Sequence, residues 1–248
     1  MTITLGMPTV APTDRMVIWE GPSLLTGEPI MVIATGVHPV GSKARASANA
    51  KTGDMIQVTI MRSDINPTEA LKRGLDVAVC GDCIHRSKAS GGLADCYTHK
   101  NLRRGFAQTG TFKAHQRSGS LPFDLARFAG RKVRFGAYGD PGAVPFEVWE
   151  EIASVASGFT GYTHQWRTGD PRMAELFMAS ADTVADRRDG RHKGYRTFRV
   201  RCSDEPRMAG EVICPASVEA GVKTDCATCL QCSGTAGDRK QDIVIVLH

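Results

Sequence analysis

The stretch VRFGAYGDPGAVPFEVWEEIASVASGFTGYTH (Val133–His164) decides the expected fold, because it runs from strand to helix to strand with short connections. Val133–Tyr138 is typical of a strand, Pro145–Ala156 of a helix that Gly158 ends, and Phe159–His164 of a second strand. A helix that links two strands in this way is the unit from which parallel sheets are built. The sequence therefore predicts an α/β protein.

The same alternation continues on both sides of this stretch. About seven strands favour a parallel-stranded, partial TIM-like barrel over an open sheet. Asn66 is an expected helix cap, with Pro67 in the first turn and Gly74 at the end of the helix. The other expected elements are strands at Met55–Met61, Leu176–Ser180, Thr197–Val200, Glu211–Cys214 and Asp242–Leu247, and short helices at Pro171–Glu175 and Thr183–Arg188.

Two regions are expected along the chain. Residues 1–50 have the composition of an irregular arm, because Pro, Gly, Ser and Ala recur around one apolar run at Ile30–Ala34. Residues 51–248 are expected to form one barrel-like α/β domain, with a cysteine-rich cluster at residues 214–232.

The composition is that of an ordinary globular protein, with 248 residues, 42% hydrophobic and 23% charged residues, and a net charge of +5. No run of eighteen apolar residues occurs, so we expect no membrane span. The first residues lack the basic and apolar segments of a secretory signal. We therefore expect a cytoplasmic protein whose thiols stay reduced.

Seven of the eight cysteines fall into two groups, and only Cys202 stands apart. The first group is Cys80, Cys83 and Cys96, and the second is Cys214, Cys226, Cys229 and Cys232. Two thiolates separated by two residues can bind one soft metal ion or one iron–sulfur cluster, so all seven are candidate metal ligands.

The two groups predict different sites. Four thiolates can close a zinc site or hold a [4Fe–4S] cluster, and the CxxCxxC at Cys226–Cys232 favours iron–sulfur. The first group has three cysteines, so one metal position stays open unless His85, His99 or Cys202 supplies a fourth ligand. An open position indicates a reactive site, whereas a fourth ligand would complete a structural zinc site.

Polar residues follow several expected strands. Cys80 stands at the end of Val77–Val79, an expected strand, and Asp140, His164 and Asp182 also stand at the ends of expected strands. Because the carboxyl ends of parallel strands lie at one edge, we expect these three residues to be catalytic, as proton-transfer or hydrogen-bonding groups.

Basic runs indicate a contact with phosphate or nucleic acid. Arg103 and Arg104 belong to one run, and Arg199 and Arg201 to another. Such runs attract nucleotides or nucleic acids, although a solvated surface is the other interpretation.

The chain resembles a group of small cysteine-rich proteins of tailed bacteriophages and of bacterial genomes that carry phage-derived DNA. The resemblance covers roughly residues 50 to 248 and implies an infected or lysogenic bacterial host, but no particular reaction. Its motifs are CGDCIHR (Cys80–Arg86), CYTH (Cys96–His99), AYGDPGAVPFEVW (Ala137–Trp149), GYTHQWR (Gly161–Arg167), GYRTFRV (Gly194–Val200) and CPASVEAGVKTDCATCLQCSG (Cys214–Gly234).

A weaker resemblance is to radical S-adenosylmethionine enzymes, which have a partial α/β barrel, a three-cysteine [4Fe–4S] site and often an auxiliary cluster. Cys80, Cys83, Cys96 and Tyr97 are similar to that layout, and Gly139–Pro141 is similar to a strand-end turn of those enzymes. The chain departs from their tight CxxxCxxC, because twelve residues separate Cys83 from Cys96. This resemblance implies S-adenosylmethionine as a candidate cofactor.

The leading hypothesis is an iron–sulfur enzyme with one or two [4Fe–4S] clusters that acts on a nucleotide or a nucleic-acid base. One alternative is a zinc-stabilised nucleic-acid-binding protein, and another is a zinc-dependent DNA-modification enzyme with Asp140 or Asp182 as nucleophile or base. A hydrolase with Cys202 as nucleophile is the remaining option, because Arg199 and Arg201 would lower the pKa of its thiol.

Overall fold

The computed structural model describes residues 14–96, 98, 107–237 and 240–246. The strands are β1 (Arg15–Pro22), β2 (Pro29–Thr35), β3 (Ile56–Arg62), β4 (Lys132–Tyr138), β5 (Gly158–Thr160), β6 (Tyr162–Thr163), β7 (Met178–Ala181), β8 (Thr197–Arg201), β9 (Glu211–Ile213) and β10 (Asp242–Val246). The helices are α1 (Pro67–Lys72), α2 (Val77–Cys80), α3 (Ala107–Ser118), α4 (Phe146–Val155), α5 (Met173–Leu176), α6 (Val184–His192) and α7 (Cys226–Cys229). The predicted α/β class is confirmed.

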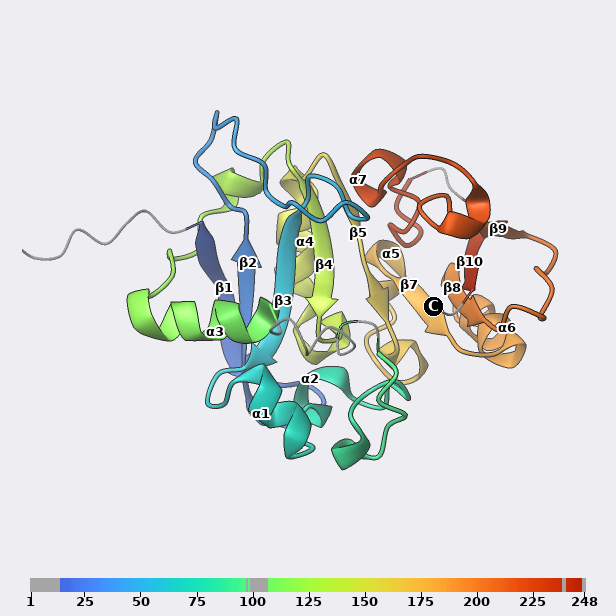
Figure 1. The fold of residues 1–248 in the computed structure, drawn as a ribbon, viewed down its shortest axis with the longest axis horizontal. Helices are drawn as coiled ribbons and strands as arrows, with labels where there is room; N and C mark the ends of the chain where they lie inside the picture. The colour runs from blue at the N-terminus through green and yellow to red at the C-terminus, as the bar shows by residue number, and fades with distance from the viewer. Residues whose placement is uncertain (1–13, 97, 99–106, 238–239, 247–248) are drawn as a thin grey trace, which may run out of the picture.

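The strands form two sheets that lie side by side (Figure 1). In the first, the order is β1-β2-β3-β4-β5, with β1 to β3 antiparallel and β3 to β5 parallel. In the second, the order is β6-β7-β8-β10-β9 and all pairs are parallel. In the part of the chain that the structure describes, β1 and β9 remain as edges, so the expected barrel is not closed.

A single residue, Gly161, connects the two sheets. It stands between β5 and β6, its N–H donates to the carbonyl of Cys232 at 3.0 Å, and its carbonyl accepts from the N–H of Met178 at 3.0 Å. A Cβ atom here would lie 2.6 Å from the ring of Phe177, which explains the absence of a side chain. The chain therefore passes from one sheet into the next without a turn.

The expectation that residues 1–50 form an irregular arm is wrong for β1 and β2. The apolar run Ile30–Ala34 forms most of β2, where each of these residues is at most 1% exposed. It pairs with β1 on one side and β3 on the other, and Gly27 makes the intervening turn with φ +77°. This short apolar run between turn residues is therefore a central strand of the sheet, paired on both edges.

The segment before the first cysteine is also corrected. Val77–Cys80 is the helical turn α2 and not a strand, because the N–H of Cys80 donates to the carbonyl of Asp76 at 2.8 Å. The carboxylate of Asp76 accepts from the N–H and the hydroxyl of Ser87 at 2.9 and 2.8 Å, and so holds the following loop. By contrast, the predicted cap of α1 is confirmed, with Asn66 Oδ1 accepting from the N–H of Glu69 at 3.0 Å.

Helices cover the outer faces of both sheets. Trp149 of α4 packs on Phe135 of β4 at a ring-centroid distance of 5.4 Å, and α6 lies against β7 and β8 (Figure 1). A second, smaller apolar cluster consists of Met178, Cys214, Cys232, Ile243 and Ile245. Two cysteines are therefore part of the packing of the parallel sheet.

Candidate functional site

Members of both cysteine groups line one cavity of about 530 Å³. Cys80, Cys83 and Cys96 come from the connection between β3 and β4, whereas Cys214 directly follows β9 and Cys226 is the first residue of α7. The wall between them is mainly apolar and aromatic, with Tyr138, Tyr162, Phe198, Val200 and Ile245. Thiols that are more than a hundred positions apart in the sequence thus meet at one concave site.

Two side chains hold the loop that carries the first cysteine group. The amide of Gln165 donates to the carboxylate of Asp82 at 2.9 Å, and the guanidinium of Arg86 donates to the carbonyl of Cys83 at 2.8 Å. At Gly81, which has φ +57°, a Cβ atom would lie 2.4 Å from the amide of Gln165. Burial, and then the neighbouring Cys83, raise the pKa of the Cys80 thiol well above its ordinary value.

Backbone hydrogen bonds fix the second cysteine group. The N–H of Cys214 donates to the carbonyl of Val244 at 2.8 Å, and the N–H of Cys226 donates to the carbonyl of Lys51 at 3.0 Å. Burial raises the pKa of the Cys232 thiol to about 12, and the charges of the other three thiols add to this rise. The four sulfur atoms are therefore close enough to interact electrostatically. None of the eight cysteines, all of which the structure describes, forms a disulfide.

Two histidines and an aspartate form a polar network at the same cavity. Nε2 of His85 lies 2.8 Å from one carboxylate oxygen of Asp182, and Nε2 of His164 lies 3.6 Å from the other. Nδ1 of His85 lies 2.7 Å from the carboxylate of Asp95. Nε2 of His164 is also 3.7 Å from Sγ of Cys83. The network therefore links the first cysteine group to the ends of β6 and β7.

The network shifts the pKa values of its members in opposite directions. The hydrogen bond to Asp182, together with that to Asp95, raises the pKa of His85 to about 9 despite its burial. Burial alone would raise the pKa of Asp182, but hydrogen bonds from His164 and His85 lower it. Burial alone would lower the pKa of His164, but Asp182 and Cys83 raise it well above its ordinary value.

Asp140, which the sequence predicts as a catalytic residue, is held by hydrogen bonds on both carboxylate oxygens. It is 6% exposed, and its carboxylate accepts from the N–H of Gly142 at 2.8 Å, the hydroxyl of Thr163 at 2.6 Å and the N–H of His164 at 2.6 Å. Burial raises its pKa, and these bonds oppose the rise. Both oxygens are engaged with donors of the protein, so Asp140 sets the position of His164 at the end of β6.

The candidate fourth ligands are separated by the fold. His85 lies beside the first cysteine group, but its two ring nitrogens face Asp95 and Asp182. Cys202 is exposed and does not line the cavity. His99 lies outside the described residues. Of the described candidates, Cys202 therefore lies away from the first cysteine group, and His85 belongs to the polar network.

Two of the four arginines expected to contact nucleic acid are internal. Arg199 is 0% exposed and donates to both carboxylate oxygens of Glu211 at 2.7 and 2.9 Å, and Arg201 pairs with Glu219. These arginines alternate along β8 with Phe198 and Val200, which line the cavity, so they point to the other face. Arg103 and Arg104 lie outside the described residues.

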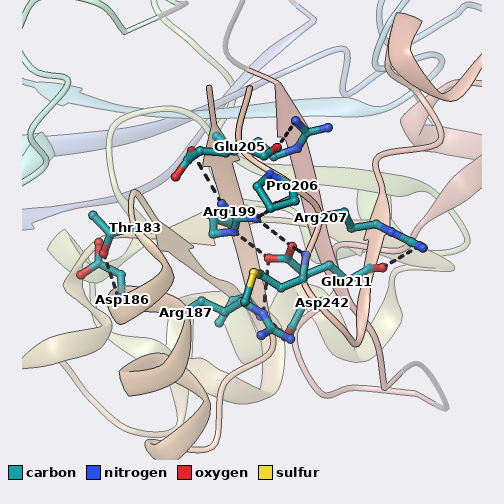
Figure 2. A network of polar contacts seen from close by, with 12 residues as sticks. Thr183, Asp186, Arg187, Arg199, Glu205, Pro206, Arg207, Glu211 and Asp242 are labelled. Carbon is teal, nitrogen blue, oxygen red and sulfur yellow. Dashed lines mark hydrogen bonds and ion pairs between the residues drawn. The ribbon is translucent and has the colours of Figure 1, made fainter. Parts of the chain in front are cut away.

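Arg199 belongs to a buried network of ion pairs (Figure 2). Asp242 and Glu211 are the first residues of the paired strands β10 and β9, and both are at most 2% exposed. Asp242 accepts from Arg187 and Arg191 at 2.9 Å each and from the N–H of Thr197 at 3.0 Å. The network joins α6 to three strands, so its role is structural.

Acidification is expected to weaken this network. Burial alone would raise the pKa of Glu211, but the hydrogen bonds from Arg199 and from the N–H of Met208, with the charges of Arg199 and Arg187, lower it below 4.5. A lowered folded-state pKa stabilises the protein above the unfolded value, and this stabilisation is lost as the pH falls through the folded value. We expect the free energy of unfolding, measured with urea, to decrease from pH 5 to pH 3. In Glu211→Gln the decrease should be smaller, and an equal decrease would contradict the assignment.

Sequence reasoning did not find Asp95, Gln165 or Lys51 as site residues. Asp95 directly precedes Cys96, and Gln165 directly follows His164, so adjacency to a chosen residue was their only signal. Lys51 precedes the first expected strand and belongs to no motif, yet it lines the cavity. Burial raises the pKa of the Cys226 thiol, and the charge of Lys51 opposes this rise.

Comparison of the chain with protein-family models, with curated proteins and with solved structures finds no match. In the described part of the chain, no helix is long and apolar enough to cross a membrane.

Proposed function

We propose that this chain is an iron–sulfur enzyme with two [4Fe–4S] clusters at one cavity. Cys80, Cys83 and Cys96 would hold a cluster with one open iron position, and Cys214, Cys226, Cys229 and Cys232 would hold the second. The observation that carries the proposal is that members of both groups line the same cavity. Two purely structural metal sites do not need to face one cavity. A substrate that contacts both clusters requires that they do.

The spacing of the thiols supports iron–sulfur over zinc. Four sulfur atoms around a zinc ion at 2.3 Å lie about 3.8 Å from one another. Among the described residues, the only group of three or more Cys, His, Asp or Glu ligand atoms that all lie within 4.8 Å of one another is His85, His164 and Asp182. Neither cysteine group meets this criterion, so the thiols are more widely spaced than a zinc tetrahedron requires.

The surroundings of the thiols fit an anionic cluster. Burial raises the pKa values of the Cys214 and Cys226 thiols, so thiolates here need cationic compensation. The charges of Arg134 and Lys51 oppose this rise at Cys226, and both residues line the cavity. A bound cluster would supply one-electron chemistry and an iron site to which a substrate atom can bind.

The volume of the cavity supports a small-molecule substrate. Its volume of about 530 Å³ lies within the range of sites for small ligands and cofactors. We propose a nucleotide or a single nucleobase as the substrate, with S-adenosylmethionine as a candidate co-substrate. Tyr138, Tyr162 and Phe198 offer ring faces to a planar base, and His164 and Asp182 would orient the substrate and exchange protons with it.

The strand arrangement supports a finer description of the fold. Gly161 alone separates β5 from β6, so the parallel strands β3-β4-β5 of the first sheet are followed by the parallel strands β6-β7-β8-β10-β9 of the second. We propose that these strands form a partial TIM-like barrel whose inner face carries the cysteine groups.

Metal and sulfide analysis of protein purified without oxygen tests the proposed function. We expect a brown protein with broad visible absorbance and about eight iron and eight sulfide ions per chain. Cys83→Ser and Cys226→Ser should each lose about half of the iron and sulfide. Cys202→Ser is the matched control, because Cys202 is exposed and outside the cavity, and it should lose neither. A colourless protein that contains zinc and no sulfide would refute the proposal.

A further inference from the structure

We infer that His85, His164 and Asp182 form a binding site for one divalent first-row transition-metal ion, separate from the thiol groups. The three ligand atoms all lie within 4.8 Å of one another, which permits simultaneous bonds to a single ion. Two imidazole nitrogens and one carboxylate oxygen are a ligand set that suits Zn²⁺, Fe²⁺ or Co²⁺ and not Mg²⁺ or Ca²⁺. This inference goes beyond the proposed function and does not require iron–sulfur clusters.

A carboxylate behind one histidine is the first independent support. Nδ1 of His85 lies 2.7 Å from the carboxylate of Asp95, on the side of the ring opposite to Asp182. Metal-binding histidines usually donate their second ring nitrogen to a carboxylate, which fixes the orientation of the ring and increases its basicity. The Asp95 contact leaves Nε2 of His85 as the nitrogen that faces the proposed ion.

The other two ligands are also held by the backbone around them. The N–H of His164 donates to Asp140 at 2.6 Å, and the N–H of Asp182 donates to the carboxylate of Asp186 at 3.1 Å. The three side chains come from the loop after α2 and from the ends of β6 and β7, and their exposures are 18%, 18% and 11%. A partly buried and preorganised set of ligands loses little conformational entropy when an ion binds.

The position of the site gives the ion an open face. His85, His164 and Asp182 all line the cavity, and three protein ligands leave at least one coordination position for water or substrate. Sγ of Cys83 is 3.7 Å from Nε2 of His164, so the ion would lie beside the first cysteine group. When an ion is bound, His85, His164 and Asp182 are ligands of the ion. Without the ion, the three residues form the hydrogen-bonded network described above.

Zinc titration of the full chain after removal of metals tests this site. We expect wild-type protein to bind one more zinc ion than His85→Ala or Asp182→Ala, whether or not iron–sulfur clusters are present. Asp95→Asn should lower the affinity of this site for zinc 10- to 100-fold. His192→Ala is the matched control, because His192 is exposed at the end of α6, and its zinc content should be unchanged. Circular dichroism of each variant establishes that it is folded.

X-ray absorption of the zinc-loaded wild type and His85→Ala gives a second readout that does not depend on the folding of one variant. The additional zinc should show nitrogen and oxygen ligands at about 2.0–2.1 Å, not sulfur at about 2.3 Å. Equal zinc content in wild type and the folded variants, or an additional zinc with sulfur ligands only, would overturn the inference. Absence of sulfide would refute the proposed function and leave this site intact, so the two failures are distinguishable.

Discussion

Arg199→Ala is expected to lower the free energy of unfolding by about 3–5 kcal/mol, because it removes both guanidinium hydrogen bonds from the buried carboxylate of Glu211. In the folded protein the guanidinium of Arg199 makes two hydrogen bonds to Glu211 and a third, of 3.1 Å, to the carbonyl of Pro206 (Figure 2). Water cannot replace the lost hydrogen bonds of Glu211, since this residue is only 2% exposed. Equilibrium unfolding in urea measures the change.

Two further variants separate the buried pair from charge in general. Arg188→Ala removes an exposed pair with Asp189 and should change the free energy of unfolding by less than about 1 kcal/mol. Arg199→Met combined with Glu211→Leu removes both charges and should recover most of the loss. A loss for Arg199→Ala no larger than that for Arg188→Ala would show that the network does not hold the strands together.

Asp140→Ala is expected to lower the free energy of unfolding by about 3 kcal/mol, because it leaves the buried hydroxyl of Thr163 and the partly buried N–H groups of Gly142 and His164 without their acceptor. The same change releases the backbone at His164, so we expect the imidazole signals of His164 to shift in nuclear magnetic resonance spectra. Both effects belong to a positioning role, since the carboxylate of Asp140 faces donors of the protein.

The matched control for this prediction is Asp124→Ala. Asp124 also accepts a backbone hydrogen bond, from Ala126 at 3.1 Å, but it is exposed, so water can replace the carboxylate and the loss should be about 1 kcal/mol or less. If Asp140→Ala were as stable as Asp124→Ala and left the His164 signals unchanged, Asp140 would not be the residue that fixes His164.

Local patterns were sufficient for the elements that carry their own start and stop signals. The cap at Asn66, the helix that begins after Pro145 and the apolar strand Asp242–Val246 all occur as the sequence predicts. The apolar run Ile30–Ala34 carries no such signals, and its role as β2 depends on the pairing with β1 and β3. The apolar residues of Val77–Cys80 suit either a strand or one helical turn, and in the folded protein they form a helical turn.

Residue identity and spacing by themselves determined the α/β class, the two cysteine groups and the strand-end positions of His164 and Asp182, because each depends on a few neighbouring residues. Tertiary structure alone decided that both thiol groups face one cavity, that His85 joins Asp182 and not the thiols, and that Arg199 is internal. These facts depend on which strands become neighbours and which face of a strand points inward, and long-range packing sets both.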